Sequence, residues 1–175
     1  MEGLGQKLQS TLQGRTCVMG VGNVDYGDDG FGVYLTEELV AAGHSDVIIA
    51  GTTPEHYLGR IAEQAFDHLL VIDATNFGDE PGTLVFLNAA EIATAFPQVS
   101  THKISLGVLA RVLEQAGTRV WLLGVQPESL EPGQELSTTM QTSMEIVHVL
   151  LRDVRACQPP RKARRHSIEA EKVLA

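Results

Sequence analysis

The stretch TCVMGVGNVDYGDDGFGV, residues 16–33, decides the fold. A short apolar segment runs into a glycine-rich turn, and apolar residues recur at helical spacing directly after it. These recurring positions are Phe31, Leu35, Leu39 and Ala42. Strand, glycine turn and helix in this order are typical of an α/β domain whose turn cradles a phosphate. Here Asp25, Asp28 and Asp29 occupy the turn, and carboxylates at short range repel a phosphate.

The glycine spacing also differs from the known nucleotide-binding fingerprints. Gly20 and Gly22 are followed by Gly27, five positions on rather than the three of a dinucleotide-binding turn. The motif G-x-x-x-x-G-K-S/T is absent from the sequence as well. The turn therefore predicts the start of an α/β domain, but not a nucleotide site.

Periodicity along the rest of the chain extends this start into a complete α/β domain. Apolar runs predict strands at about 16–22, 46–50, 68–73, 83–87 and 120–125. Helical patterns occupy about 30–42, 52–66, 88–96, 104–116 and 138–156. Thr53 and Ser137 are expected helix N-caps, while Gly43 and Gly117 are placed to end two of the helices.

The connector at 74–82 is too short to hold a crossover helix, so the strand at 83–87 is expected to run antiparallel to the one before it. Together these elements predict a three-layer α/β sandwich. Its centre is a mostly parallel, twisted, five-stranded sheet with one antiparallel strand, and helices cover both faces.

The chain of 175 residues is 43% hydrophobic and 20% charged, as in an ordinary globular protein. We expect a single domain over residues 1–157 and a basic, flexible tail over 158–175. The tail segment RKARRH, residues 161–166, also fits a contact with RNA or an acidic partner. The whole chain has a net charge of −9, and without the basic tail the domain holds 8 basic and 20 acidic residues, which makes it a poor nucleic-acid binder.

The cysteines and the hydropathy of the sequence indicate the cellular compartment in which we expect the protein. Cys17 and Cys157 lie far apart and suggest no disulfide framework, which fits a reducing compartment. No apolar run approaches the roughly 20 residues of a membrane span, and residues 1–15 lack the apolar segment of a signal peptide. We therefore expect a cytoplasmic protein without a membrane partner.

Ligands of open α/β sheets collect beyond the carboxyl ends of the strands. At that edge the predicted topology brings together Asp29, after the first strand, Asp73, at the end of the third, and His102, before the helix at 104–116. Two carboxylates and an imidazole suit a divalent ion such as zinc, nickel, iron or manganese.

Each of these residues also fits a purely structural role. Asp28 and Asp29 could stabilise the positive N-terminus of the following helix, Asp73 could start a loop, and His102 could be a surface residue. Four other histidines, His44, His56, His68 and His148, are interpreted as structural. Nucleophilic schemes fit worse, because G-x-S-x-G and H-E-x-x-H are absent and Cys17 lies at the entry of its strand.

Four segments, taken together, resemble the nickel–iron hydrogenase maturation proteases. They are GVGNVDYGDDGFG (20–32), VIDATNFGDEPGTL (71–84), STHKISLGVL (100–109) and LLGVQPESLEPG (122–133). They occur in the family's order, and the resemblance extends from about residue 16 to residue 155. The basic tail lies outside it.

The resemblance implies an endopeptidase that removes a C-terminal extension from the precursor of a hydrogenase large subunit after nickel insertion. It places catalytic and metal-contacting roles on Asp29, Asp73 and His102, with the nickel carried by the substrate. The precursor is then the partner, and nickel serves as a recognition element or as a Lewis acid. Many members carry an aspartate after the second strand that is absent from residues 48–53, which leaves the class of hydrogenase open.

Two alternatives belong to other functional classes. A receiver domain also places an acidic pair after the first strand and an aspartate at the end of the third, but it needs a lysine after the last strand. Residues 124–127 contain none. The second alternative is a non-catalytic, metal-sensing docking module for hydrogenase assembly, which would bind the precursor without shortening it.

Overall fold

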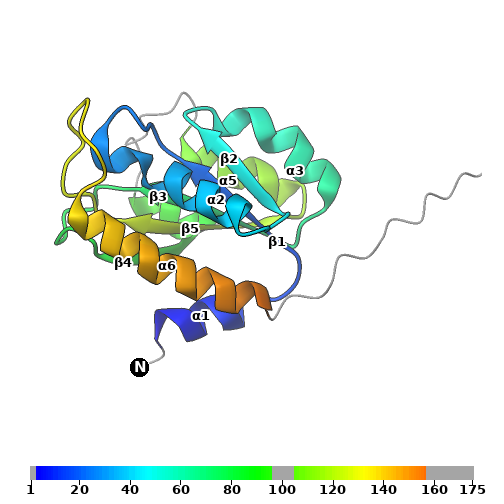
Figure 1. Ribbon diagram of the computed structural model, residues 1–175. Coiled ribbons are helices and arrows are strands. Elements are labelled where there is room, and N and C mark those ends of the chain that lie inside the picture. Colours follow the sequence, from blue (N-terminus) through cyan, green and yellow to red (C-terminus); the bar gives the residue numbers. More distant parts are fainter. Residues whose placement is uncertain (1–2, 96–104, 157–175) are drawn as a thin grey trace, which may run out of the picture.

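The computed structural model describes residues 3–95 and 105–156. Five strands form one sheet in the order β2-β1-β3-β5-β4 (Figure 1). Their bounds are β1 Thr16–Val21, β2 Val47–Gly51, β3 His68–Ala74, β4 Leu84–Asn88 and β5 Arg119–Val125. Four strands are parallel, and β4 pairs antiparallel with β5. The predicted mixed sheet, including its antiparallel strand, is confirmed.

Helices cover both faces of the sheet, as predicted. Three helices pack on one side of the sheet, namely α1 (Leu4–Thr11), α2 (Phe31–Ala41) and α6 (Thr138–Ala156) (Figure 1). The other side carries α3 (Leu58–Gln64), α4 (Ala89–Ala95) and α5 (Leu106–Gln115). The strands β1 and β3 are apolar on both faces because each lies between two helical layers, and every residue of both is buried.

Helix ends follow the sequence signals at some positions and depart from them at others. Gly43 and Gly117 adopt left-handed φ angles of 87° and 92° just past α2 and α5, as their placement predicts. Thr53 occupies the predicted N-cap position, but its side chain makes no capping hydrogen bond, because its hydroxyl donates to the Ala50 carbonyl instead. The segment after it begins as a 3₁₀ turn, η2 (Pro54–Tyr57), before α3.

The N-terminal helix α1 is absent from the sequence-based expectation. Its side chains are mostly polar, but Leu8 inside it and Leu12 directly after it are buried in the core beneath α6. The ammonium of Lys7 lies 5.5 Å from the centre of the Phe86 ring. A helix held by one narrow apolar stripe gives only a weak periodic signal.

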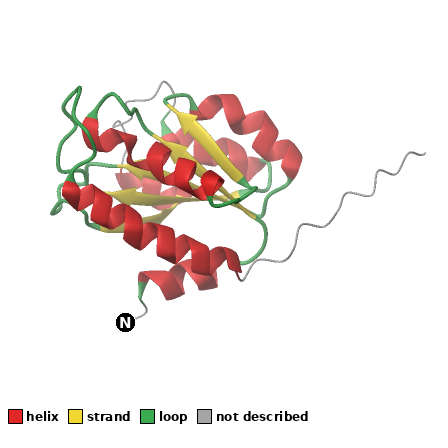
Figure 2. Cartoon of the chain, viewed as in Figure 1, coloured by secondary structure: helices red, strands yellow, loops and turns green. Residues whose placement is uncertain are grey.

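The loops that follow β1, β3 and β5 gather at one end of the molecule, because parallel strands point their carboxyl ends the same way (Figure 2). We call these loops, residues 22–30, 75–83 and 126–137, the carboxyl-end loops. The predicted tail at 158–175 and Cys157 lie outside the described residues, so the domain boundary at 157 stays a prediction. Within the described ranges, no helix combines the length and the apolar character that crossing a membrane requires.

Candidate functional site

Asp29 and Asp73 converge where the first and third strands end. Asp73 is the last but one residue of β3 and pairs in register with Gly124 of β5. Asp29 belongs to η1 (Gly27–Gly30), the 3₁₀ turn that leads into α2. Asp73 is only 7% exposed and Asp29 only 8%, and the negative charge of Asp29 raises the pKa of Asp73. The structure therefore brings together the two predicted site carboxylates.

Two glycines permit this convergence. A Cβ on Gly32 would come within 2.3 Å of the Ile72 carbonyl and 2.4 Å of the Val21 carbonyl, so α2 could not begin directly over the strand ends with any larger residue. Gly22 has a φ of 139°, and a Cβ there would lie 1.8 Å from the Asp29 carbonyl oxygen. The glycines of the opening motif thus bring backbone segments close together, rather than cradle a phosphate.

The environment of Asp73 is unfavourable for an unliganded carboxylate. Burial raises the pKa of Asp73 well above its usual range, the negative charge of Asp29 raises it further, and a hydrogen bond with the Ala74 backbone acts in the opposite direction. Among the described residues, neither Asp73 Oδ1 nor the nearby Thr75 hydroxyl has a hydrogen-bond partner. A buried acceptor without a donor fits a site that a cation completes.

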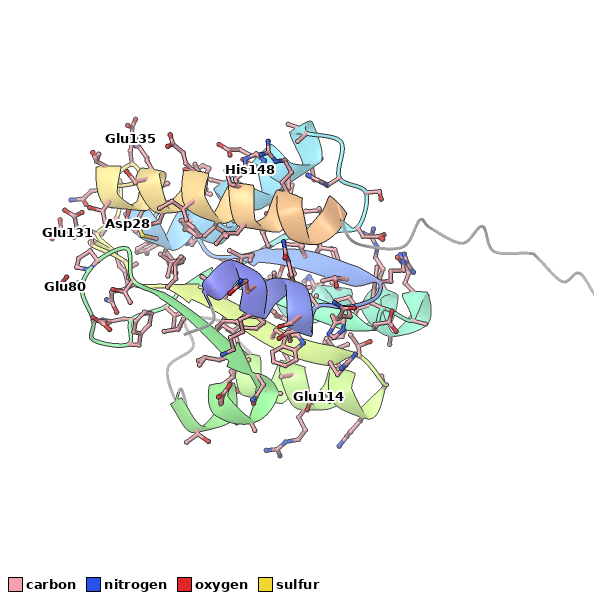
Figure 3. All side chains as sticks on the ribbon, turned by 90° about the horizontal axis from the view of Figure 1, so that it is seen from below. Asp28, Glu80, Glu114, Glu131, Glu135 and His148 are labelled. Carbon is pink, nitrogen blue, oxygen red and sulfur yellow. The ribbon has the colours of Figure 1, made fainter. Side chains whose placement is uncertain are left out.

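Charge around the site has one sign. The carboxyl-end loops contain no lysine or arginine, and Figure 3 shows Asp28, Glu80, Glu131 and Glu135 at the same end of the molecule. Glu114, at the end of α5, lies apart from them (Figure 3). Such a field attracts cations and opposes the approach of anions.

The two adjacent aspartates of η1 have different surroundings. Asp29 Oδ2 accepts a hydrogen bond from the Asn23 backbone N–H at 2.8 Å, which closes the turn around it. Asp28 accepts hydrogen bonds from residues about 100 positions away, in the loop after β5. Its hydrogen-bond donors therefore belong to another loop, although Asp28 also lies in the acidic first turn that leads into α2, where the structural alternative places it.

Gln126 is a buried site-edge residue that the sequence-based reasoning did not identify. Its Oε1 accepts from three successive backbone N–H groups, those of Phe77 at 2.9 Å, Gly78 at 3.0 Å and Asp79 at 3.3 Å. Its Nε2 donates to Asn76 Oδ1 and to the Pro127 carbonyl. Gln126 thereby fixes the loop that follows Asp73. A polar residue at the end of a buried strand, directly before a proline, was the available signal.

The third predicted site residue, His102, lies outside the described residues, and its role stays a prediction. Over 3–95 and 105–156, no three His, Cys, Asp or Glu side chains are grouped so that they could hold a metal ion. Asp29 and Asp73 therefore do not form a complete metal site with any third described residue. Cys17 is buried within β1 and, as predicted, lies away from the carboxyl-end loops.

Comparison with known proteins agrees with this architecture. A family model described as hydrogenase maturation protease matches residues 33–152, a range that includes Asp73 and begins after Asp29. The Hydrogenase 3 maturation protease of Escherichia coli K12 is 33% identical over 130 residues, which cover 73% of this chain and 83% of that protein. The Hydrogenase 2 maturation protease of the same strain is 31% identical over 140 residues, with coverage of 75% and 84%.

Solved structures give the same result. The crystal structure of the NiFe hydrogenase maturation protease HycI from Thermococcus kodakarensis KOD1 matches with a TM-score of 0.70 and 32% identity, covering 80% of this chain and 91% of that one. The resemblance inferred from the four sequence segments is confirmed, and the receiver-like alternative is left without support. This chain belongs to the hydrogenase maturation protease family and is a peptidase.

Proposed function

We propose that this peptidase removes the C-terminal extension of a nickel–iron hydrogenase large-subunit precursor after nickel insertion. Asp29, Asp73 and His102 contact the nickel that the precursor already carries. The observation that supports this most is the buried carboxylate pair at the carboxyl end of the sheet, in which Asp73 Oδ1 has no partner among the described residues. The names of the relatives support a hydrogenase precursor as the substrate.

Electrostatics explain why a metal-loaded substrate is recognised. Without a cation, the Asp29 charge and the loss of water both disfavour ionised Asp73, so the pKa of Asp73 is raised. A dication brought in by the precursor reverses this balance and favours two ionised carboxylates. Nickel-free precursor offers no such gain, and the carboxylate pair therefore discriminates between the two forms.

The chain's own residues bind and orient the substrate. Asp29 and Asp73 approach from the helix side and the strand side of the same edge, and their burial keeps bulk water from the carboxylates. The substrate's metal supplies either recognition alone or Lewis-acid activation of the scissile carbonyl or a water. We also propose a cytoplasmic reaction, because Cys17 and Cys157 fit a reducing compartment.

The test is to incubate the protein with nickel-free and nickel-loaded precursor and to determine the C-terminal mass of each product. Shortening of the nickel-loaded form alone is expected. Asp29→Asn should reduce the rate at least about 100-fold, whereas Asp25→Asn, which removes an exposed charge from the same loop, should not. Equal shortening of both precursors would refute nickel recognition, and binding without any shortening would identify a docking module instead.

A further inference from the structure

Asp28 joins two carboxyl-end loops that lie far apart in the sequence. The side chain is 1% exposed. Oδ2 accepts from the backbone N–H groups of Glu128 at 2.8 Å and Ser129 at 3.0 Å, and from the Ser137 hydroxyl at 3.0 Å. Oδ1 accepts from the Ser137 N–H at 2.7 Å. Both ends of the loop at 128–137 are thus held by one carboxylate.

Backbone contacts reinforce the same junction. The Asp28 N–H donates to the Ser129 carbonyl at 3.0 Å, and the Gly133 N–H donates to the Asp25 carbonyl at 2.8 Å. Gly27 allows the approach, since a Cβ there would lie 3.1 Å from the Ser129 carbonyl oxygen. Asp28 has four donors and therefore needs no cation, in contrast to Asp73.

The joined loops present apolar side chains next to the candidate site. Val24 and Tyr26, from the loop after β1, and Leu130, from the loop after β5, are large exposed hydrophobic residues. Val24 packs against the turn that carries Asp29, because a Cβ on Gly30 would meet Val24 Cα at 3.1 Å. These three exposed apolar side chains belong to two different loops, and the junction at Asp28 holds those loops together.

We propose that Asp28 is a positioning residue for substrate binding: it holds residues 128–137 against the turn of Asp29, so that the exposed apolar side chains of both loops, Val24, Tyr26 and Leu130, are held in place to contact the precursor. The inference rests on the proposed function. Because the Asp28 carboxylate is buried and accepts four hydrogen bonds from this chain, it acts on the substrate only through the loops it holds. Its loss should therefore weaken substrate binding and raise KM, with a smaller effect on kcat.

The variant Asp28→Asn removes this clamp with almost no change in size. An amide has one accepting oxygen, so its NH₂ group must face either the Ser137 N–H or the N–H groups of Glu128 and Ser129. At least one donor therefore loses its acceptor in either orientation. The matched control is Asp25→Asn, which removes the same charge from the same loop without removing any described side-chain hydrogen bond.

The experiment measures three quantities on the full chain: amide hydrogen exchange, binding of nickel-loaded precursor, and KM and kcat for its shortening. In Asp28→Asn, exchange in 128–137 should rise at least about tenfold while exchange in β1 and β3 stays unchanged, and precursor affinity should fall about tenfold with kcat changed less than threefold. Asp25→Asn should match the wild type in all three.

The outcomes separate this inference from the proposed function. If Asp28→Asn binds the precursor as tightly as the wild type, or loses kcat and not affinity, the positioning role is refuted even though cleavage persists. If the wild type binds but does not shorten the precursor, the proposed proteolysis fails, and the affinity difference still decides the role of Asp28. A wild type that does not bind the precursor at all would refute both.

Discussion

Two buried polar side chains at opposite ends of β3, His68 and Asp73, differ in how their hydrogen-bonding atoms are satisfied. At the amino end, His68 is fully buried at the start of β3, yet both ring nitrogens are bonded. Trp121 Nε1 donates to His68 Nδ1 at 3.0 Å, and His68 Nε2 lies 2.8 Å from the Gln13 carbonyl. At the carboxyl end of the same strand, Asp73 Oδ1 has no partner among the described residues.

Hydrogen-bond chemistry fixes the form of His68. An indole N–H can only donate, so Nδ1 must accept and Nε2 must carry the proton that goes to the Gln13 carbonyl. The ring is therefore neutral, and the Arg119 guanidinium 3.0 Å from Nε2 is a contact between two donors. Burial lowers the pKa of His68, and the nearby Arg119 charge lowers it too, while the Gln13 bond and Asp67 act to raise it.

The difference between the two ends shows that the sheet stabilises the fold at its amino end and carries the candidate site at its carboxyl end. At the amino end, both ring nitrogens of His68 are hydrogen-bonded within the chain, which stabilises the fold, although the Thr16 hydroxyl beside it on β1 is buried without a partner among the described residues. Asp29 and Asp73 at the carboxyl end repel each other, which is a cost that a bound cation removes. Variants of Asp73 should therefore lower activity and raise stability, whereas variants of His68 should lower stability and leave activity nearly unchanged.

The largest effect is expected for Asp73→Asn. Cleavage of nickel-loaded precursor should fall at least about 100-fold, while the unfolding temperature at pH 7 should rise by about 2–4 °C, as about 1 kcal/mol produces in a chain of this size. The folded-state pKa of Asp73 is raised, so the ionised carboxyl costs stability as pH rises above the unfolded value near 3.8. Thermal unfolding at pH 7 and pH 3.5 measures this, and the gain should disappear at the lower pH.

A variant that is both inactive and destabilised at pH 7 would contradict this interpretation of Asp73. Such a result would mean that the carboxylate contributes to the fold through partners outside the described residues.

The second effect lies at the amino end, in His68→Ala. Loss of a fully buried ring together with its two hydrogen bonds should cost about 2–4 kcal/mol of unfolding free energy. Because the residue is at the far end of β3 from Asp73, kcat/KM at a temperature where the variant is folded should stay within twofold of the wild type. Urea unfolding and steady-state cleavage measure the two quantities, with exposed His56→Ala as the control. A tenfold loss of kcat/KM would show that the two ends are coupled.

Gln126→Met should have an intermediate effect on stability, together with a local effect on the loop that follows Asp73. The N–H groups of residues 77–79 would lose a shared acceptor, but their loop is accessible to water, so we expect a cost of about 1–2 kcal/mol. Hydrogen exchange should increase in residues 75–83 before it does elsewhere. Exposed Gln115→Met is the control. Unchanged exchange in that loop would show that Gln126 does not organise it.

The sequence predicted the fold where the signal was local. Apolar runs marked every strand, Gly43 and Gly117 marked two helix ends, and a short connector marked the antiparallel strand. Helix α1 gave no comparable signal, because its burial depends on contacts with α6, which is formed by the other end of the chain.

For the site, the sequence predicted that Asp29 and Asp73 meet, since strand ends share an edge. It assigned the site role to Asp29 rather than Asp28, but it did not predict the structural role of Asp28, because the donors that bind Asp28 lie about 100 residues away. The role of Gln126 was missed for the same reason, because its side-chain oxygen accepts hydrogen bonds from a loop almost 50 residues earlier in the sequence. Neighbours in sequence reveal side-chain type, whereas hydrogen-bond partners across loops depend on the folded arrangement.

The smallest effect is a pH dependence at the amino end. His68 has a lowered pKa in the folded state, so below its unfolded value near 6.5 the unfolded chain takes up a proton that the folded chain does not. Stability should therefore fall with pH below about 6.5, by at most about 1.4 kcal/mol per pH unit for one group. In His68→Asn the side-chain oxygen can still accept from Trp121 but cannot titrate, and this slope should be lost.

Subtracting the variant's unfolding free energy from that of the wild type at each pH isolates the His68 contribution. Asp73 titrates with the opposite sign, because its raised pKa makes the folded state more stable as pH falls, but its contribution is the same in both proteins and cancels. The difference between the two free energies should shrink steadily from pH 7.5 to 5.5. A difference that is constant across this range would mean that His68 is equally protonated in the folded and unfolded chains. Such a result would contradict the assignment of a neutral imidazole with a hydrogen bond at each ring nitrogen.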